Sequence, residues 1–277
     1  MGTFSEATAV TPVGENKFDV ELDGTWSIST KLHGGYLLAV VARAAGEVAE
    51  HPHLTAISGA FPSAPEPGPA RVEVELLNSG RSQSQLRANL VQNGKVCLAA
   101  LVTQGILTEN DPTWTSVEPL DLPPESECVR TPSTFAGPGD PFAIPLMDVV
   151  ETRLVPGDAG FAVGRPSGTG SLSTYHRLAD GMDWDPLSLL VALDPVPPIT
   201  FDLGVPGWVP TLQMSAYIRR LPAPGSVKVR MTGGDITGNR LDETASAWDS
   251  KDRLVGQAVQ FAGVRMPKGR SEYDHSR

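Results

Sequence analysis

A threonine and a glutamine occur twice in this chain at the same spacing. Thr211 lies 156 residues after Thr55, and Gln260 lies 156 residues after Gln104. A hydroxyl and a carboxamide can each donate and accept a hydrogen bond, so such a pair can orient a water molecule. A pattern that recurs at a fixed offset indicates a repeated structural unit. Two copies indicate a duplicated domain, because a solenoid needs about three repeats or more.

Other kinds of reactive site lack their sequence signatures. The chain has no GxSxG, HExxH or GxxxxGK[ST] motif and no CxxC pair, and GTGS at 168–171 lacks the third glycine of a dinucleotide loop. None of the five histidines has triad-like neighbours in the sequence. Cys97 and Cys128 are isolated, and the sequence leaves a bridge between them open. We therefore expect no metal and no cofactor.

The composition is that of an ordinary globular protein. The chain has 277 residues, of which 40% are hydrophobic and 19% charged, and its net charge is −10. An acidic chain without a lysine or arginine cluster is a poor candidate for binding nucleic acid. No signal-peptide pattern is present, and the longest apolar run, 36–42, is far shorter than the roughly 20 residues of a membrane span. We therefore expect a cytoplasmic protein.

Patterning divides the chain into two units and a linker. In the first unit, residues 1–107, Gly34 and Gly35 open a helix whose first turns are apolar on every side, which indicates a buried helix. Alternation of apolar and charged residues over 70–76 predicts a strand with one buried face and one solvent-exposed face. Further strands are expected at 51–61, 85–91 and 95–106. Residues 108–147 are rich in proline and acidic residues, which predicts an extended linker.

The second unit, residues 148–277, is expected to repeat this plan. Asp185 and Pro186 form an N-cap and a first-position proline for a second buried helix over 187–193. Strands are expected at 148–155, 171–178, 211–220 and 226–232, followed by two closing strands around a turn at 249–252. The predicted fold class is α+β, with two copies of a long buried helix wrapped by a curved antiparallel sheet.

Four segments carry a resemblance to a known family. They are HGGYLLAVVARAA in the first unit and, in the second, LADGMDWDPLSLLVALDPVPPITFDLG, VPTLQMSAYIRRLPAPG and WDSKDRLVGQAVQFAGV. With the duplicated plan, they resemble the acyl-CoA thioesterase II family and its actinobacterial thioesterase-like relatives, which have a double hotdog fold. The resemblance covers residues 18–265. The chain departs from enterobacterial members in the sequence LQMSAYIRR after Thr211, and this difference bears on the substrate class.

The resemblance implies hydrolysis of fatty acyl-CoA thioesters to a free fatty acid and CoA. In the family, an Asp at the end of the second helix, a Thr or Ser on the next strand and a Gln on the last strand hold and activate a water. At the matching positions this chain has Asp194, Thr211 and Gln260. Asp194 would act as a general base or orient the water. Considered alone, an Asp before a proline also fits an ordinary turn residue.

The start of the first helix offers donors for an oxyanion. Free backbone N–H groups at a helix start can bind developing negative charge, and Gly34, Gly35 and Tyr36 are the candidates. The two glycines are equally compatible with a packing requirement. In a duplicated fold, the helix start of one copy can face the sheet of the other, so the site is expected to be composite.

The first unit is expected to hold a degenerate or purely structural site. It keeps Thr55 and Gln104, but no Asp follows its helix, and Glu47 is the nearest carboxylate apart from Glu50.

Two other functions stay open. A non-catalytic acyl-CoA or lipid-binding protein would keep the same fold. A hydratase or dehydratase of acyl thioesters pairs an Asp with a His a few residues on, whereas PVPPITF follows Asp194 here. The expected partner is an acyl-CoA, with its phosphates contacted locally by Arg219, Arg220 or Lys228. Proteins with the hotdog fold commonly assemble, which suggests a homo-oligomer, either a dimer or a larger assembly.

Overall fold

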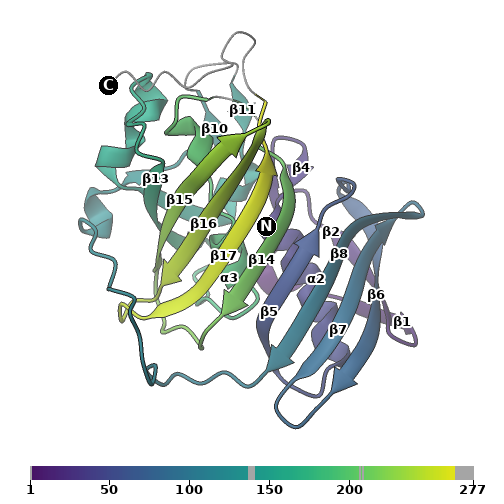
Figure 1. Cartoon of the computed structure of the whole chain (residues 1–277). Coiled ribbons are helices and arrows are strands. Elements are labelled where there is room, and N and C mark those ends of the chain that lie inside the picture. The colour runs from purple at the N-terminus through teal and green to yellow at the C-terminus, as the bar shows by residue number, and fades with distance from the viewer. Residues whose placement is uncertain (1, 137–140, 206, 208, 266–277) are drawn as a thin grey trace.

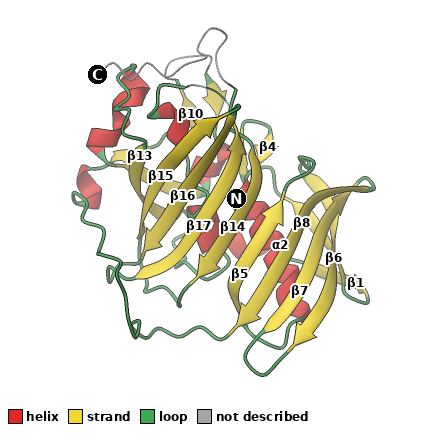
Figure 2. Ribbon diagram, viewed as in Figure 1, coloured by secondary structure: helices red, strands yellow, loops and turns green. Residues whose placement is uncertain are grey.

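The computed structural model describes residues 2–136, 141–205, 207 and 209–265, and a large antiparallel sheet dominates it (Figure 1). Within the described residues this sheet has 13 strands in the order β1-β2-β6-β7-β8-β5-β14-β17-β16-β15-β13-β12-β9. The strands from β1 to β5 in this order belong to the first unit, and the others follow the first unit in the chain. The sheet therefore consists of two consecutive halves. Figure 2 shows the helices packed against its inner face.

The first half of the sheet wraps around helix α2, Gly34–Val48. A short helix, α1 (Phe4–Ala7), and a ladder of β3 (Ser27–Ile28) with β4 (Lys31–Leu32) precede α2. The strands are β1 (Thr11–Gly14), β2 (Lys17–Leu22), β5 (His53–Ala60), β6 (Gly68–Ser79), β7 (Ser84–Gln92) and β8 (Lys95–Gly105). The strands predicted in the first unit are thus confirmed.

Helix α2 forms where the sequence predicts a buried helix. His33 is its N-cap, and its ring accepts a hydrogen bond from the Tyr36 amide. The helix is apolar on most sides because sheet, α1 and α3 surround it. Its buried residues are Gly35, Tyr36, Leu37, Leu38, Ala39, Val40, Val41, Ala42, Ala44 and Ala45.

The second half of the sheet repeats the antiparallel plan. Its strands are β9 (Val129–Arg130), β12 (Val150–Leu154), β13 (Ser171–Leu178), β14 (Thr211–Ile218), β15 (Val227–Thr237), β16 (Arg240–Trp248) and β17 (Leu254–Gly263). Three 3-10 helices lie among them, namely η2 (Pro145–Asp148), η3 (Pro156–Val163) and η4 (Ile199–Phe201).

The second buried helix is shorter than predicted. The sequence indicates a helix over 187–193, but α3 comprises only Leu189–Ala192. The amides of Leu190 and Val191 bond to carbonyls three residues back, whereas Leu189 and Leu193 bond four residues back. This mixed pattern gives a single tight turn. The N-cap of α3 is Ser188 and not the predicted Asp185. Asp185 Oδ1 instead accepts a hydrogen bond from the Ser188 amide at 2.6 Å in the turn before the helix.

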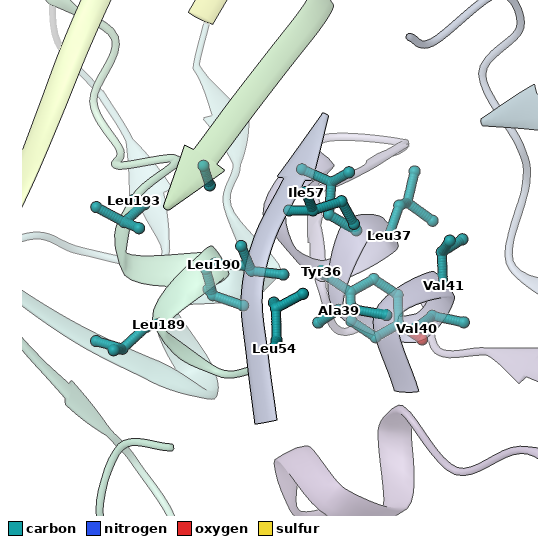
Figure 3. Close-up of a cluster of buried hydrophobic side chains, with 14 of the residues drawn as sticks. Tyr36, Leu37, Ala39, Val40, Val41, Leu54, Ile57, Leu189, Leu190 and Leu193 are labelled. Atoms are coloured by element: carbon teal, nitrogen blue, oxygen red, sulfur yellow. The ribbon is translucent and has the colours of Figure 1, made fainter. Parts of the chain in front are cut away.

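The two halves join through adjacent strands and a shared core. Strands β5 and β14 pair antiparallel, and the hydroxyls of Ser58 and Ser215 lie 2.8 Å apart across this seam. Leu54 of β5 and Leu189 and Leu190 of α3 gather with α2 side chains in one buried cluster (Figure 3). The architecture is the one expected of a double hotdog, and the two units share one interior.

The segment predicted as a linker is mostly irregular but contributes to the second unit. It contains η1 (Glu125–Glu127), β9, the ladder of β10 (Thr134–Phe135) with β11 (Phe142–Ala143), and η2. Strand β9 pairs with β12 at the edge of the large sheet. The Phe135 ring packs against Phe142 and Phe201. Phe135 and Phe142 thus dock onto the second half, whereas Trp114 of the same segment is exposed.

Two sequence expectations concern single features. Cys97 and Cys128 are both buried and both free. In the described part of the chain, no helix combines the length and apolar character that crossing a membrane requires.

Candidate functional site

The carboxylate of Asp194 lies at the amino-terminal end of helix α2. Asp194 follows α3 directly, since Leu193 is the C-cap of that helix and Pro195 cannot continue it. Oδ2 of Asp194 accepts a hydrogen bond of 2.8 Å from the backbone amide of Gly35, and the residue is only 9% exposed. The partial positive charge at the start of a helix stabilises a carboxylate in this position.

His33 holds the backbone of Asp194. Its Nδ1 accepts a hydrogen bond from the Tyr36 amide at 3.3 Å, so the ring proton of the neutral form is on Nε2. Nε2 donates to the main-chain oxygen of Asp194 at 2.6 Å and lies 3.3 Å from Oδ2 of the same residue. This pair could not be predicted from the sequence, because its members lie 161 positions apart in the chain.

Thr211 reaches the same corner from the sheet. It is the first residue of β14, and the pairing register with β17 shifts between Thr211 and Gln213. A Cβ placed on Gly34 would lie 2.9 Å from Asp194 Oδ2 and 3.6 Å from Thr211 Oγ1. The carboxylate and the hydroxyl therefore converge over the backbone of Gly34. Within the described residues, Thr211 Oγ1 makes no hydrogen bond, so it is available to a water or a substrate.

Gln260 donates a hydrogen bond to a buried glutamate whose pKa Asp194 affects. Gln260 on β17 lies directly opposite Glu243 on β16, and its Nε2 donates to Glu243 Oε1 at 2.9 Å. Burial, and after it the negative charge of Asp194, raise the pKa of Glu243 to about 8, against a smaller lowering by the Ile199 backbone amide. The electrostatic influence of Asp194 shows that Glu243 lies in its neighbourhood, whereas the contact of Gln260 is with Glu243.

The three candidate oxyanion donors differ in their availability. The Gly35 amide donates to Asp194, and the Tyr36 amide donates to His33. The Gly34 amide has no hydrogen bond in the described part of the chain. Of the three, Gly34 is therefore the one whose N–H is free to meet a substrate oxygen.

The corresponding residues of the first unit are engaged elsewhere. Thr55 Oγ1 donates to the carbonyl of Thr103 at 3.0 Å, and Gln104 Nε2 donates to the carbonyl of Ala42 at 3.2 Å. Glu47 is exposed on the last turns of α2. These contacts agree with the expectation of a degenerate site, which stays a prediction.

The candidate CoA-binding cations lie far from Thr211. Arg219 and Arg220 follow the far end of β14, which has 8 residues and so spans about 26 Å at roughly 3.3 Å per residue. Arg220 donates to the carbonyl of Asn110, and Lys228 forms an ion pair with Asp252. A contact between these cations and CoA stays a prediction, and the site itself contains none of them.

A signal for the missed glutamate was present in the sequence. Residues 240–248 read RLDETASAW, and Leu241, Glu243 and Ala245 alternate on the buried face of β16. A carboxyl group on an otherwise apolar strand face needs a specific partner, which marks it as a candidate site residue. His33 carried a weaker signal, since it directly precedes the two glycines that open the helix.

Family models match both units of the chain. Residues 22–105 match the acyl-CoA thioesterase N-terminal domain, and residues 121–264 match the acyl-CoA thioesterase C-terminal domain. The two matches include all the residues of the site described above, from His33 to Gln260, and together they cover well over half of the chain.

Individual proteins are similar over nearly the full length. An uncharacterized protein of Mycobacterium tuberculosis is 29% identical over 294 residues, covering 94% of this chain and 98% of that protein. A solved structure of a Thermobifida fusca protein provisionally named thioesterase II is 31% identical, with a TM-score of 0.86 over 95% of this chain and 97% of the other. An acyl-CoA thioesterase II from Mycobacterium marinum shares the fold, with 18% identity and a TM-score of 0.69 over 96% and 100% of the two chains.

Proposed function

Because this chain belongs to the acyl-CoA thioesterase II family, we propose that it hydrolyses fatty acyl-CoA thioesters to a free fatty acid and CoA. The observation that carries the proposal is the convergence of the Asp194 carboxylate and the Thr211 hydroxyl over the backbone of Gly34. A carboxylate and a hydroxyl in this arrangement can bind one water between them and direct its oxygen at a carbonyl carbon.

In the proposed reaction, Asp194 is the general base. The water oxygen forms a bond to the thioester carbonyl carbon while one water proton passes to Asp194, and the carbonyl becomes an oxyanion. Collapse of this intermediate breaks the carbon–sulfur bond, and the proton held by Asp194 passes to the departing sulfur. The products are the fatty acid and the CoA thiol. General base catalysis of this kind contributes about 10²- to 10⁴-fold to the rate.

The remaining groups orient the water and stabilise the intermediate. Thr211 Oγ1 can accept one water proton or donate to the water oxygen, and the Gln260 carboxamide can do the same from the neighbouring strand. The free Gly34 amide at the start of α2 is suited to donate to the oxyanion, where the helix dipole also favours negative charge.

The proposed site requires both units. Gly34 and Gly35 come from the first unit, whereas Asp194, Thr211 and Gln260 come from the second. This composite arrangement explains why α2 starts with two glycines. A Cβ on Gly35 would lie 2.2 Å from the carbonyl oxygen of Leu190, so only a glycine lets α2 approach α3 closely enough to bond Asp194.

The contact of His33 with Asp194 bears on the dehydratase alternative. A histidine base needs a free ring nitrogen to remove a proton from its substrate. Both nitrogens of His33 have protein partners, and the residue is 2% exposed. These contacts favour a positioning role for His33 and hydrolysis over dehydration.

The test is CoA release from acyl-CoAs of rising chain length, by wild type and by Asp194→Asn. An asparagine keeps the size of the side chain and an oxygen for the Gly35 amide but cannot accept a proton from water. We expect the variant to lose activity by about 10²-fold or more. Asp121→Asn is the matched control, since Asp121 is exposed, and it should behave as wild type. A wild type that binds acyl-CoA and never releases CoA would support the non-catalytic binding protein instead.

A further inference from the structure

Glu243 is a buried carboxyl group that the reaction outlined above does not use. It lies on the inner face of β16 and is 6% exposed. Its inward neighbours on the same strand, Leu241 and Ala245, are apolar. On the adjacent strands it faces Gly233 and Gln260. Burying a carboxyl group is costly unless the surroundings supply hydrogen bonds or a countercharge, so this position requires an explanation.

Among the described residues, no cation balances this carboxyl group. In the part of the chain that the structure describes, Glu243 forms no ion pair. The titratable groups that face it are Asp194 from the end of α3 and, in contact with Asp194, His33 from the start of α2. The adjoining residues of β15 and β17, and the Ile199 backbone of η4, carry no charge. Each of two carboxyl groups that interact electrostatically disfavours ionisation of the other.

The two oxygens of Glu243 have different surroundings. Oε1 accepts the hydrogen bond from Gln260 Nε2 at 2.9 Å. Oε2 is buried and makes no well-aligned hydrogen bond to any described residue, although the Ile199 amide lies near enough to affect the carboxyl group. A proton on Oε2 therefore displaces no existing bond and leaves Oε1 as an acceptor.

We propose that Glu243 is carried protonated in the folded protein and is a positioning residue that holds the Gln260 carboxamide with its oxygen turned toward the attacking water. The inference rests on the proposed function for the identity of that water. With Oε1 of Glu243 accepting from Nε2, the carboxamide oxygen of Gln260 is left to accept a water proton. Without this contact, the amide can turn over and present its NH2 group to the water.

The first unit lacks this arrangement. Opposite Gln104 lies Ser84, whose hydroxyl is 2.8 Å from His51 Nδ1. Gln104 donates to a carbonyl of α2 instead. The second unit, which holds Asp194, thus has a carboxyl group opposite its glutamine. The first unit, which has no aspartate after its helix, has a hydroxyl group there. This difference is expected if the carboxyl group serves the reaction.

The proposal has a definite pH dependence. The pKa of Glu243 is raised, first by burial and then by Asp194, to about 8. Near pH 7 the carboxyl group is neutral, and above about pH 8 it adds a second negative charge beside Asp194. We therefore expect kcat to fall on the alkaline side as Glu243 ionises, after correction for the uncatalysed hydrolysis of the thioester.

The first arm of the test is difference infrared spectroscopy, which does not depend on any activity. Wild type should show the carbonyl band of a protonated carboxyl group at pH 7, which disappears with a midpoint near pH 8. The band should be absent from Glu243→Gln, present in the exposed control Glu15→Gln, and shifted to a lower midpoint in Asp194→Asn. A neutral-pH band that is equal in wild type and Glu243→Gln, or absent from both, would overturn the protonated state.

The second arm follows the Gln260 amide and turnover. Glu243→Ala should lower kcat about tenfold with little change in KM, as expected for the loss of one orienting hydrogen bond. Glu243→Gln, which keeps an acceptor for Gln260, should recover most of that loss and lose the alkaline limb. Slow hydrogen exchange of the Gln260 side-chain amide in wild type and its loss in Glu243→Ala report the same contact without substrate.

The outcomes separate the two ideas. If wild type hydrolyses no acyl-CoA, the proposed function fails, and the infrared band with the amide exchange still decides the role of Glu243. If wild type is active and Asp194→Asn is not, but Glu243→Ala has normal kcat and a wild-type pH profile, the positioning role is refuted and the thioesterase proposal stands.

Discussion

Replacing three glycines of one helix by alanine should affect stability and turnover differently at each position, because each added methyl group contacts a different neighbour. In α2, a Cβ on Gly34 would lie 2.9 Å from Asp194 Oδ2, and a Cβ on Gly35 would lie 2.2 Å from the Leu190 carbonyl oxygen. A Cβ on Gly46 meets only Gln104 Nε2, at 3.5 Å. The first contact involves the end of a side chain, the second involves backbone, and the third is an ordinary contact.

The magnitudes follow from these distances. Gly34→Ala requires the Asp194 carboxylate to move by a few tenths of an ångström, so we expect stability within about 1 kcal/mol of wild type and kcat reduced by up to about 10²-fold. Gly35→Ala must separate α2 from α3, which costs about 3 kcal/mol or more and removes the bond to Asp194. Gly46→Ala, in an exposed helix position, should stabilise the protein by up to about 1 kcal/mol.

Thermal unfolding followed by circular dichroism and CoA release on the same preparations provide the assay. The reasoning requires Gly34→Ala to fold normally and be impaired in turnover, and Gly46→Ala to be normal in both. A Gly34→Ala protein with wild-type kcat would show that Asp194 does not act from its position at the helix start. A Gly35→Ala protein as stable as wild type would refute the close contact between α2 and α3.

Two further predictions concern other parts of the molecule. Thr211→Ala should lower kcat about tenfold or more, whereas Thr55→Ala, whose hydroxyl bonds to its own strand neighbour, should leave turnover unchanged; equal losses in both would contradict a single working site. Burial, with the charge of His33, lowers the pKa of His176 from 6.5 to about 3. His176 thus becomes protonated near pH 6.5 in the unfolded chain but stays neutral down to about pH 3 in the folded protein. The free energy of unfolding therefore falls as the pH drops from about 6.5 toward 3. His176→Gln should show a shallower fall of Tm with pH over this window, and an unchanged slope would be evidence against this linkage.

The architecture was largely predictable because its signals are local. The apolar run after Gly34 and Gly35 specifies a buried helix, and strict alternation specifies the strands. The spacing of the two Thr–Gln pairs indicated the duplication before any element was assigned. The sequence overestimated α3, since Leu187 to Leu193 is apolar enough for a longer helix, and the prolines at 186 and 195 do not reveal that only one turn forms between them.

The sequence named the candidate site residues but not their contacts. Asp194, Thr211 and Gln260 followed from a family resemblance, and the structure brings Asp194 and Thr211 together at Gly34. The partners that hold them were not found. His33 lies 161 positions from Asp194, and Glu243, although it is on the strand next to that of Gln260, stands in a strand with ordinary alternation. The sequence also offered three backbone donors without showing that two are engaged. The contacts of His33 and Gly35 with Asp194 depend on how one unit faces the other, which local patterns do not encode.

The central claim is that Asp194 activates the water that cleaves an acyl-CoA thioester. The most direct measurement is kcat for CoA release by wild type and Asp194→Asn on the acyl-CoA that wild type cleaves fastest, with the affinity for that substrate measured in parallel. The account predicts turnover by wild type, a loss of about 10²-fold or more in the variant and similar affinities. Equal turnover by the two proteins would contradict it.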